Sequence, residues 1–201
     1  MISTSTRLPR LTAGLSLIEL LVVISVVTLI TAGLLIQHSG FNSTTLLNNL
    51  AYDVALSIRQ AQAYGISVRN AGGSNFSAGY GVNFDPTRPD SYVLFQDLGS
   101  TPNNAYDHNG NTIDTDDPEF VERYTLRRGH VISNVCRVGS TSVCFDGGLT
   151  MMNIVFRRPN PDAIVNNTTS YEATVEISSQ DGEAQRTIHV LPTGQISISN
   201  P

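Results

Sequence analysis

Residues 14–36 read GLSLIELLVVISVVTLITAGLLI and decide how the chain is organised. The stretch is apolar except for Glu19 and a few hydroxyl-bearing residues, and a leader with Arg7 and Arg10 precedes it. As an α-helix, residues 15–36 would extend roughly 33 Å, about the thickness of a bilayer core. We therefore expect a single transmembrane helix at 15–36 and an extracytoplasmic domain after it.

Glu19 is the unusual residue of this segment. A carboxylate in hydrocarbon costs roughly 2.5–3.5 kcal/mol on insertion scales, so such a residue usually has a partner and a role. A cut between Gly14 and Leu15 would create an ammonium group about one helical turn from Glu19, and a neighbouring subunit's ammonium could also pair with it. Hydropathy alone equally fits an uncleaved signal anchor.

Gly14 followed by Leu15-Ser16-Leu17-Ile18-Glu19 and a long apolar run resembles the prepilin signature of type IV pilins and type II secretion pseudopilins. The resemblance implies that residues 1–14 are a leader removed by a prepilin peptidase. It also implies N-methylation of Leu15, where the family more often has Phe or Met, and an assembly role for Glu19. The partners implied are other pilins through the N-terminal helix and an inner-membrane assembly platform.

An amphipathic helix is predicted for 37–70. Its apolar residues recur at steps of three and four, as on one helix face, and they are Leu47, Leu50, Ala51, Val54, Ile58, Ala61 and Gly65. This face should pack against a sheet. The Ala71-Gly72-Gly73-Ser74 stretch is expected to end the helix.

Short β-type runs separated by turns fill 71–201. The predicted strands are 79–84, 92–96, 120–126, 131–138, 143–145, 153–156, 171–178, 186–191 and 195–199. A long helix followed by an antiparallel sheet is an α+β architecture.

The resemblance extends to the GspH/FimT branch of pilin-like proteins, and it implies a type IV pilin-like fold. The matching stretches are Leu56–Ala63 (LSIRQAQA), Gly79–Val82 (GYGV) and Pro192–Ile196 (PTGQI).

A polar stretch at 107–119 is the candidate metal site. Asp107, Asn109, Asn111 and Asp114 supply oxygen atoms around Gly110, as Ca²⁺ prefers, although the spacing departs from an EF-hand. A polar turn explains the same residues. We expect no other cofactor.

Cys136 and Cys144 are the two cysteines. Their spacing suits a hairpin, and outside the cytoplasm they are expected to form a disulfide. Two buried thiols are the alternative, and no histidine stands at metal-ligand spacing from them.

Nucleic-acid binding and catalysis find little support in the sequence. The net charge is −5, and the arginine pairs 127–128 and 157–158 should point to opposite strand faces. Gly194 is followed by Gln195, Ile196 and Ser197, whereas DNA-binding FimT-like pilins resemble one another in a Gly-Arg-x-Arg motif at this place. The four histidines are dispersed along the chain, and no nucleophile motif occurs.

The sequence thus predicts a non-enzymatic minor pilin or pseudopilin, held in the inner membrane and then built into a type IV pilus or a secretion pseudopilus. A DNA-binding competence pilin and a membrane-anchored extracytoplasmic binding domain or enzyme are the alternatives.

Overall fold

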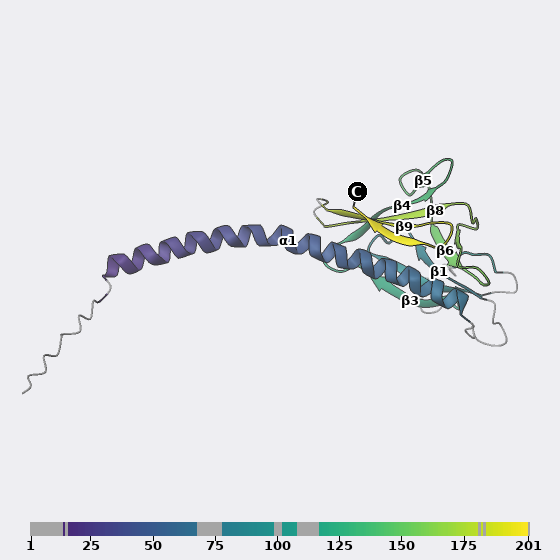
Figure 1. Cartoon of the computed structure of the whole chain (residues 1–201), viewed down its shortest axis with the longest axis horizontal. Helices are drawn as coiled ribbons and strands as arrows, with labels where there is room; N and C mark the ends of the chain where they lie inside the picture. Colours follow the sequence, from purple (N-terminus) through teal and green to yellow (C-terminus); the bar gives the residue numbers. More distant parts are fainter. Residues whose placement is uncertain are drawn as a thin grey trace, which may run out of the picture. The chain divides into compact units, whose positions relative to one another are not determined.

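A computed structural model describes Gly14 and residues 16–67, 78–98, 102–107, 117–180, 182 and 184–200, without the side chains of 36–43. It divides into two compact units, Met1–Asn42 and Ser43–Pro201 (Figure 1). Each unit is described by itself.

One helix, α1, runs from Leu17 to Ile66. Ser16 caps its start, because its hydroxyl accepts the N–H of Glu19 at 3.3 Å, which is half of a Ser-x-x-Glu capping box. At the other end, Ser67 donates its hydroxyl to the carbonyl of Tyr64 at 3.1 Å. The helix therefore ends before the predicted boundary at residue 70, and residues 71–74 lie outside the described part of the chain.

Ten strands form two antiparallel sheets in the described residues, where the sequence predicts a single sheet. Sheet A has the order β3-β2-β1-β6-β7. Its strands are β1 (Gly79–Phe84), β2 (Ser91–Asp97), β3 (Phe120–Thr125), β6 (Met152–Phe156) and β7 (Ala163–Val165). Sheet B has the order β10-β9-β8-β4-β5. Its strands are β4 (Val131–Val138), β5 (Val143–Cys144), β8 (Glu172–Ser178), β9 (Gln185–Val190) and β10 (Ile196–Ser199).

The predicted α+β class is confirmed, and nine of the ten strands match predicted runs. The exception is β7, whose three residues are too few for an alternating pattern. Tertiary contact defines this strand: Ala163 donates its N–H to the carbonyl of Pro192 at 3.0 Å. Short β-type runs between turns revealed the strands but did not show which strands pair, and so the division into two sheets was not predicted.

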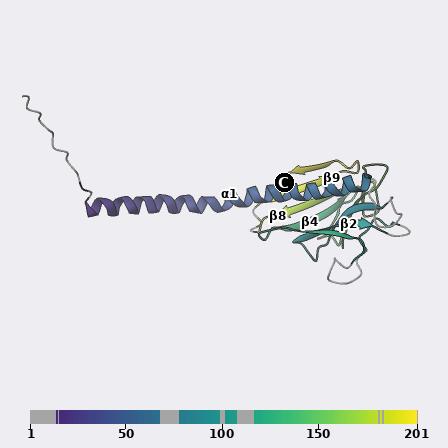
Figure 2. The same cartoon turned by 90° about the horizontal axis from the view of Figure 1, so that it is seen from below.

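The Ser43–Ile66 part of α1 supplies the centre of a core shared by both sheets (Figure 2). Every apolar position of the predicted stripe is buried, with Leu47, Ala51 and Ile58 at 0% exposure. They pack in one cluster with sheet A residues such as Phe84 and sheet B residues such as Val175. The predicted packing face is therefore correct, and it faces two sheets.

A side chain of α1 also holds the turn between β9 and β10. The amide of Gln62 donates to the carbonyls of Pro161 at 3.0 Å and Gly194 at 2.9 Å. Gly194 has φ of +79°, a conformation that residues with a Cβ rarely adopt. The turn that carries the resemblance at 192–196 is thus fixed by its glycine and by the helix.

The predicted disulfide is present. Cys136 and Cys144 are directly opposed on β4 and β5, and their sulfur atoms are bonded. The bond ties β5, a strand of two residues at the edge of sheet B, to its neighbour.

Gly65→Ala tests the close approach of α1 to β6. In an unobstructed helix this change would stabilise the protein by about 1 kcal/mol, but here the new methyl group would collide with the backbone carbonyl of Phe156. We expect a lower free energy of unfolding, by about 1–3 kcal/mol, measured by urea denaturation. A stabilised variant would show that the helix and β6 are further apart than described.

Candidate functional site

The first candidate site is the exposed apolar part of α1. Leu17–Leu35 is long and apolar enough to cross a membrane, and none of it is buried within the protein. Its hydroxyl groups bond to the helix backbone: Ser25, Thr28 and Thr31 donate to carbonyls one turn earlier at 2.7–2.8 Å. The segment therefore indicates insertion into a membrane, either as an anchor or as a secretory signal, which shares these properties.

Gly14 and Glu19 lie at the start of this segment, and both are exposed. Glu19 stands at the third position of the helix, where the N–H bonds to Ser16. A carboxylate in the first turn is favourable in any helix, because the N-terminal end carries a partial positive charge. The carboxylate of Glu19 therefore stands where the end of the helix favours a negative charge. Leu15, the predicted methylation site, lies outside the described residues.

The predicted calcium loop is described only in part. Asp107 accepts two hydrogen bonds from the side-chain amide of Asn103, at 2.8 and 3.0 Å. Asn109, Asn111 and Asp114 lie outside the described residues, and within the described ranges no group of three or more His, Cys, Asp or Glu side chains is placed to hold a metal. The calcium site remains a prediction.

Three neighbouring carboxylates are buried. Asp97, Asp117 and Glu119 are at most 4% exposed. Asp97 accepts the backbone N–H groups of Asn103 and Asn104 at 3.2 and 3.0 Å, and it pairs with the guanidinium of Arg157 at 3.1 Å. The Asp97 carboxylate therefore holds residues 103 and 104 next to the end of β2.

The other two carboxylates bind the same segment. Glu119 accepts the N–H groups of Leu98 at 2.9 Å and Asp107 at 2.8 Å, and Asp117 accepts the hydroxyl of Tyr106 at 2.9 Å. Burial raises the pKa of Glu119 above its ordinary value of 4.5, against the opposing effect of these two N–H groups. Burial also raises the pKa of the Tyr106 hydroxyl, and its bond to Asp117 adds to the shift.

Glu119 is expected to make stability depend on pH. Since its pKa is higher in the folded than in the unfolded protein, the folded state binds this proton more tightly, and lowering the pH toward 4.5 stabilises the fold through this group. Glu119→Gln cannot titrate. The free energy of unfolding of the wild type, minus that of the variant, should therefore increase as the pH falls from neutral toward 4.5.

Urea denaturation of both proteins across this pH range measures that difference. A difference that does not change with pH would show that the Glu119 carboxyl titrates alike in the two states.

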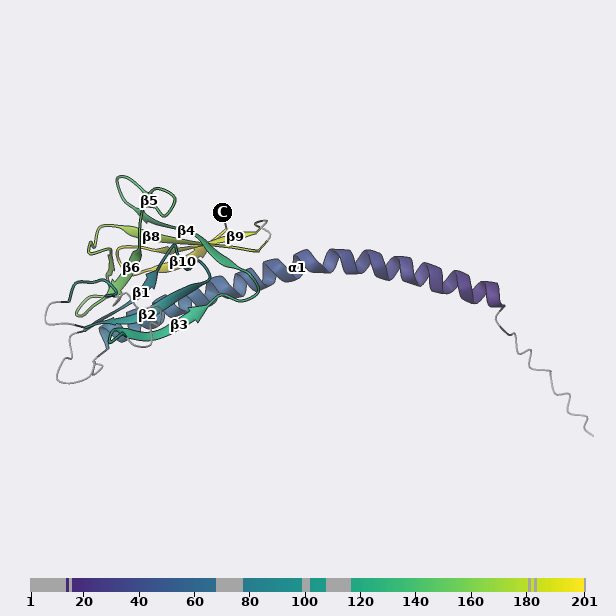
Figure 3. The same cartoon turned by 180° about the vertical axis from the view of Figure 1, so that it is seen from behind.

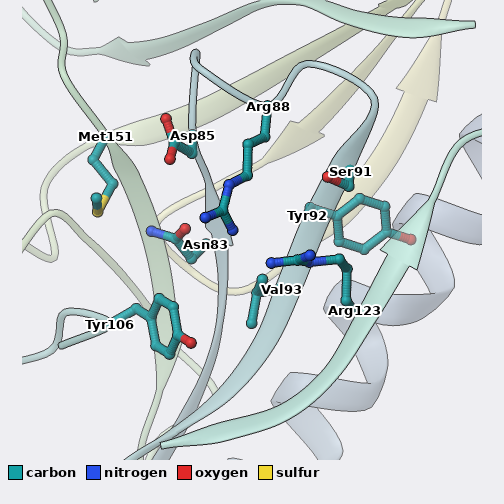
Figure 4. Close-up of a pocket in the computed structure, with 9 residues that line it drawn as sticks. All are labelled: Asn83, Asp85, Arg88, Ser91, Tyr92, Val93, Tyr106, Arg123 and Met151. Atoms are coloured by element: carbon teal, nitrogen blue, oxygen red, sulfur yellow. The ribbon is translucent and has the colours of Figure 1, made fainter. Parts of the chain in front are cut away.

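The second candidate site is a small cavity on the outer face of sheet A. Two guanidinium groups, those of Arg88 and Arg123, point into the same space (Figure 4). Its volume of about 30 Å³ holds a water molecule or a small ion. It is lined by Asn83, Asp85, Arg88, Ser91, Tyr92, Val93, Tyr106, Arg123 and Met151.

Three other arginines have separate partners. Arg157 bonds to Asp97, Arg137 lies 4.5 Å from the ring centre of Tyr171, and Arg186 donates to Asn48.

One histidine cluster was also missed. His189 Nδ1 lies 2.6 Å from a carboxylate oxygen of Glu172, and its Nε2 lies 3.0 Å from the hydroxyl of Ser199. The order Ser–His–carboxylate is that of a hydrolase triad. These residues lie on the neighbouring strands β10, β9 and β8, so the two bonds link three strands of sheet B. We therefore assign the cluster to cross-strand stabilisation.

Comparison with known proteins found no matching family model, no matching curated protein and no matching solved structure.

Proposed function

We propose that this protein is a non-enzymatic minor pilin or pseudopilin, a filament subunit of type IV pilin-like fold. The observation that carries the proposal is the division of α1. Its first part, Leu17–Leu35, is apolar and unburied, while its last part is the centre of a folded domain's core. A helix of this kind can anchor the domain in a membrane and later bury its apolar surface among the helices of other subunits.

Removal of residues 1–14 would create the positive charge that can pair with the Glu19 carboxylate. Cleavage after Gly14 would leave a terminal ammonium close to the first turn of α1. The partial positive charge at a helix start disfavours an ammonium there, so a carboxylate from the same or a neighbouring subunit would be needed to offset it. Pairing between subunits is favourable in one register only, because an unpaired charge in apolar surroundings is costly.

Gly14→Ala tests the processing step. We expect the wild type, extracted from its native membrane, to have lost residues 1–14 and gained one methyl group, and the variant to keep its leader. Intact-mass spectrometry measures both. A wild-type protein that retains its leader would refute the proposal, and one cut elsewhere would assign the segment to ordinary secretion.

Glu19 variants separate charge pairing from helix capping. Gln can take the place of Glu in a capping box, so Glu19→Gln keeps the cap and removes the charge. Charge pairing predicts that incorporation into filaments falls about tenfold or more in both Glu19→Gln and Glu19→Ala, a change that corresponds to ~1.4 kcal/mol or more.

Sheared filaments are quantified against total membrane protein by immunoblot, with Ser16→Ala as the control that weakens the cap alone. If Glu19→Gln assembles like the wild type while Glu19→Ala does not, the residue acts through the cap only.

A further inference from the structure

The turn between β3 and β4 carries two neighbouring arginines, Arg127 and Arg128, and both are exposed. Neither side chain has a hydrogen bond, an ion pair or a ring contact within the part of the chain that the structure describes. Every other described arginine interacts with another group, and these are Arg59, Arg88, Arg123, Arg137, Arg157, Arg158 and Arg186. The two guanidinium groups of this turn are therefore available to a partner outside the chain.

The backbone of the turn makes Arg128 unusual. Arg128 has φ of +59° and Gly129 has φ of +73°, and the N–H of His130 donates to the carbonyl of Arg127 at 3.4 Å. A tight turn with positive φ at both central residues favours Gly, Asn or Asp, because other side chains are strained there. Residues strained in this way are concentrated at functional sites. Arg128 weakens the turn and forms no bond within the described chain, so an external ligand would account for an arginine here.

The turn lies at the end of the domain where α1 enters it (Figure 3). Along β3, the hydroxyl of Tyr124 contacts Gln60 at 3.2 Å, whereas Arg127 lines the same groove as Leu50. The strand therefore runs toward the start of the helix segment that the domain encloses. From this end the chain continues into the apolar segment Leu17–Leu35. The two arginines thus lie on the side of the domain to which the membrane anchor is attached.

Two acids lie close to the turn. Asp53 lines the groove beside Arg127, and Asp90 accepts the N–H of Leu126 at its carbonyl and the hydroxyl of Ser91 at its carboxylate. Neither carboxylate forms an ion pair with the two arginines in the described structure. The unpaired positive charge is therefore confined to an exposed turn, which suits contact with a layer of anions rather than with a ligand that the domain encloses.

We propose that Arg127 and Arg128 bind the phosphate groups of anionic phospholipids at the surface of the membrane that holds α1. Guanidinium groups match the geometry of phosphate oxygens, and basic residues close to an anionic bilayer are attracted to it. The contact would hold the domain inclined toward the bilayer, with the β3–β4 turn facing the headgroups. This inference rests on the membrane anchor alone, and it stands whether or not the protein is cleaved after Gly14 or enters a filament.

The test uses the full-length protein in nanodiscs, where α1 holds every variant at the bilayer whatever the lipid. Nanodiscs of phosphatidylglycerol and of phosphatidylcholine both carry a trace of the same zwitterionic lipid with a photoreactive diazirine in its headgroup. Mass spectrometry then quantifies cross-links at residues 125–130. We expect at least tenfold more cross-linking there in phosphatidylglycerol, and loss of this preference in about 1 M salt, where the Debye length is about 3 Å.

Arg128→Asn is the sharpest variant. Asn tolerates positive φ, so this change removes the charge and relieves the turn. We expect a higher unfolding midpoint together with at least threefold less cross-linking in phosphatidylglycerol. The double variant Arg127→Gln/Arg128→Asn should lose the preference for phosphatidylglycerol. Arg59→Gln is the control, because it removes an exposed arginine on the β10 side of α1, and it should cross-link as the wild type does.

Two results would overturn the proposal: equal cross-linking of residues 125–130 in the two kinds of nanodisc, or a double variant that behaves as the wild type does. A gel shift with double-stranded DNA, using the protein in phosphatidylcholine nanodiscs, tests the other phosphate-bearing partner. If the lipid preference is absent and the double variant loses a DNA shift that the wild type shows, the two arginines belong to a nucleic-acid site instead.

Discussion

Burial of one helical stripe holds the domain together. Ala51, Val54 and Ile58 of α1 are at most 1% exposed and contact apolar residues from both sheets. Neither sheet could cover its inner face without the helix, because an apolar sheet face requires a second layer. The same close packing restricts position 65 of the helix to glycine, because a side chain there would collide with the backbone of Phe156 in β6. The packing of both sheets against each other therefore depends on this contact.

Periodicity was sufficient to predict this part of the structure. Steps of three and four between Leu47 and Gly65 identified the buried face, and short β-type runs between turns identified nine strands. Pairing partners were not predictable, because a strand's pattern shows which face is buried and not which neighbour it has. The three residues of β7 gave no pattern at all, since their place depends on the carbonyl of Pro192, distant in sequence.

The polar residues were predicted less well. Asp97, Asp117 and Glu119 accept hydrogen bonds from the protein, a role that the sequence did not predict. The one signal in the sequence is position: Asp97 comes directly after a predicted strand and Glu119 directly before another, where loop N–H groups need acceptors. The cluster of Glu172, His189 and Ser199 could be found only once the order of β8, β9 and β10 was known. By contrast, Cys136 and Cys144 lie close enough in sequence for their pairing to be inferred from hairpin geometry.

The described strands leave the two sheets with four outer edges, and these differ in how they are closed. On β7, Ala163 and Val165 donate their N–H groups to Pro192 and Thr168. β5 has two residues and a disulfide, and the carbonyl of Ile196 in β10 accepts a bond from Arg59 at 3.4 Å. A chain with two open edges can add copies without limit, as in a fibril. In the described part of the chain, three of the four edges are short or partly occupied in these ways, so growth by strand addition is restricted on those sides.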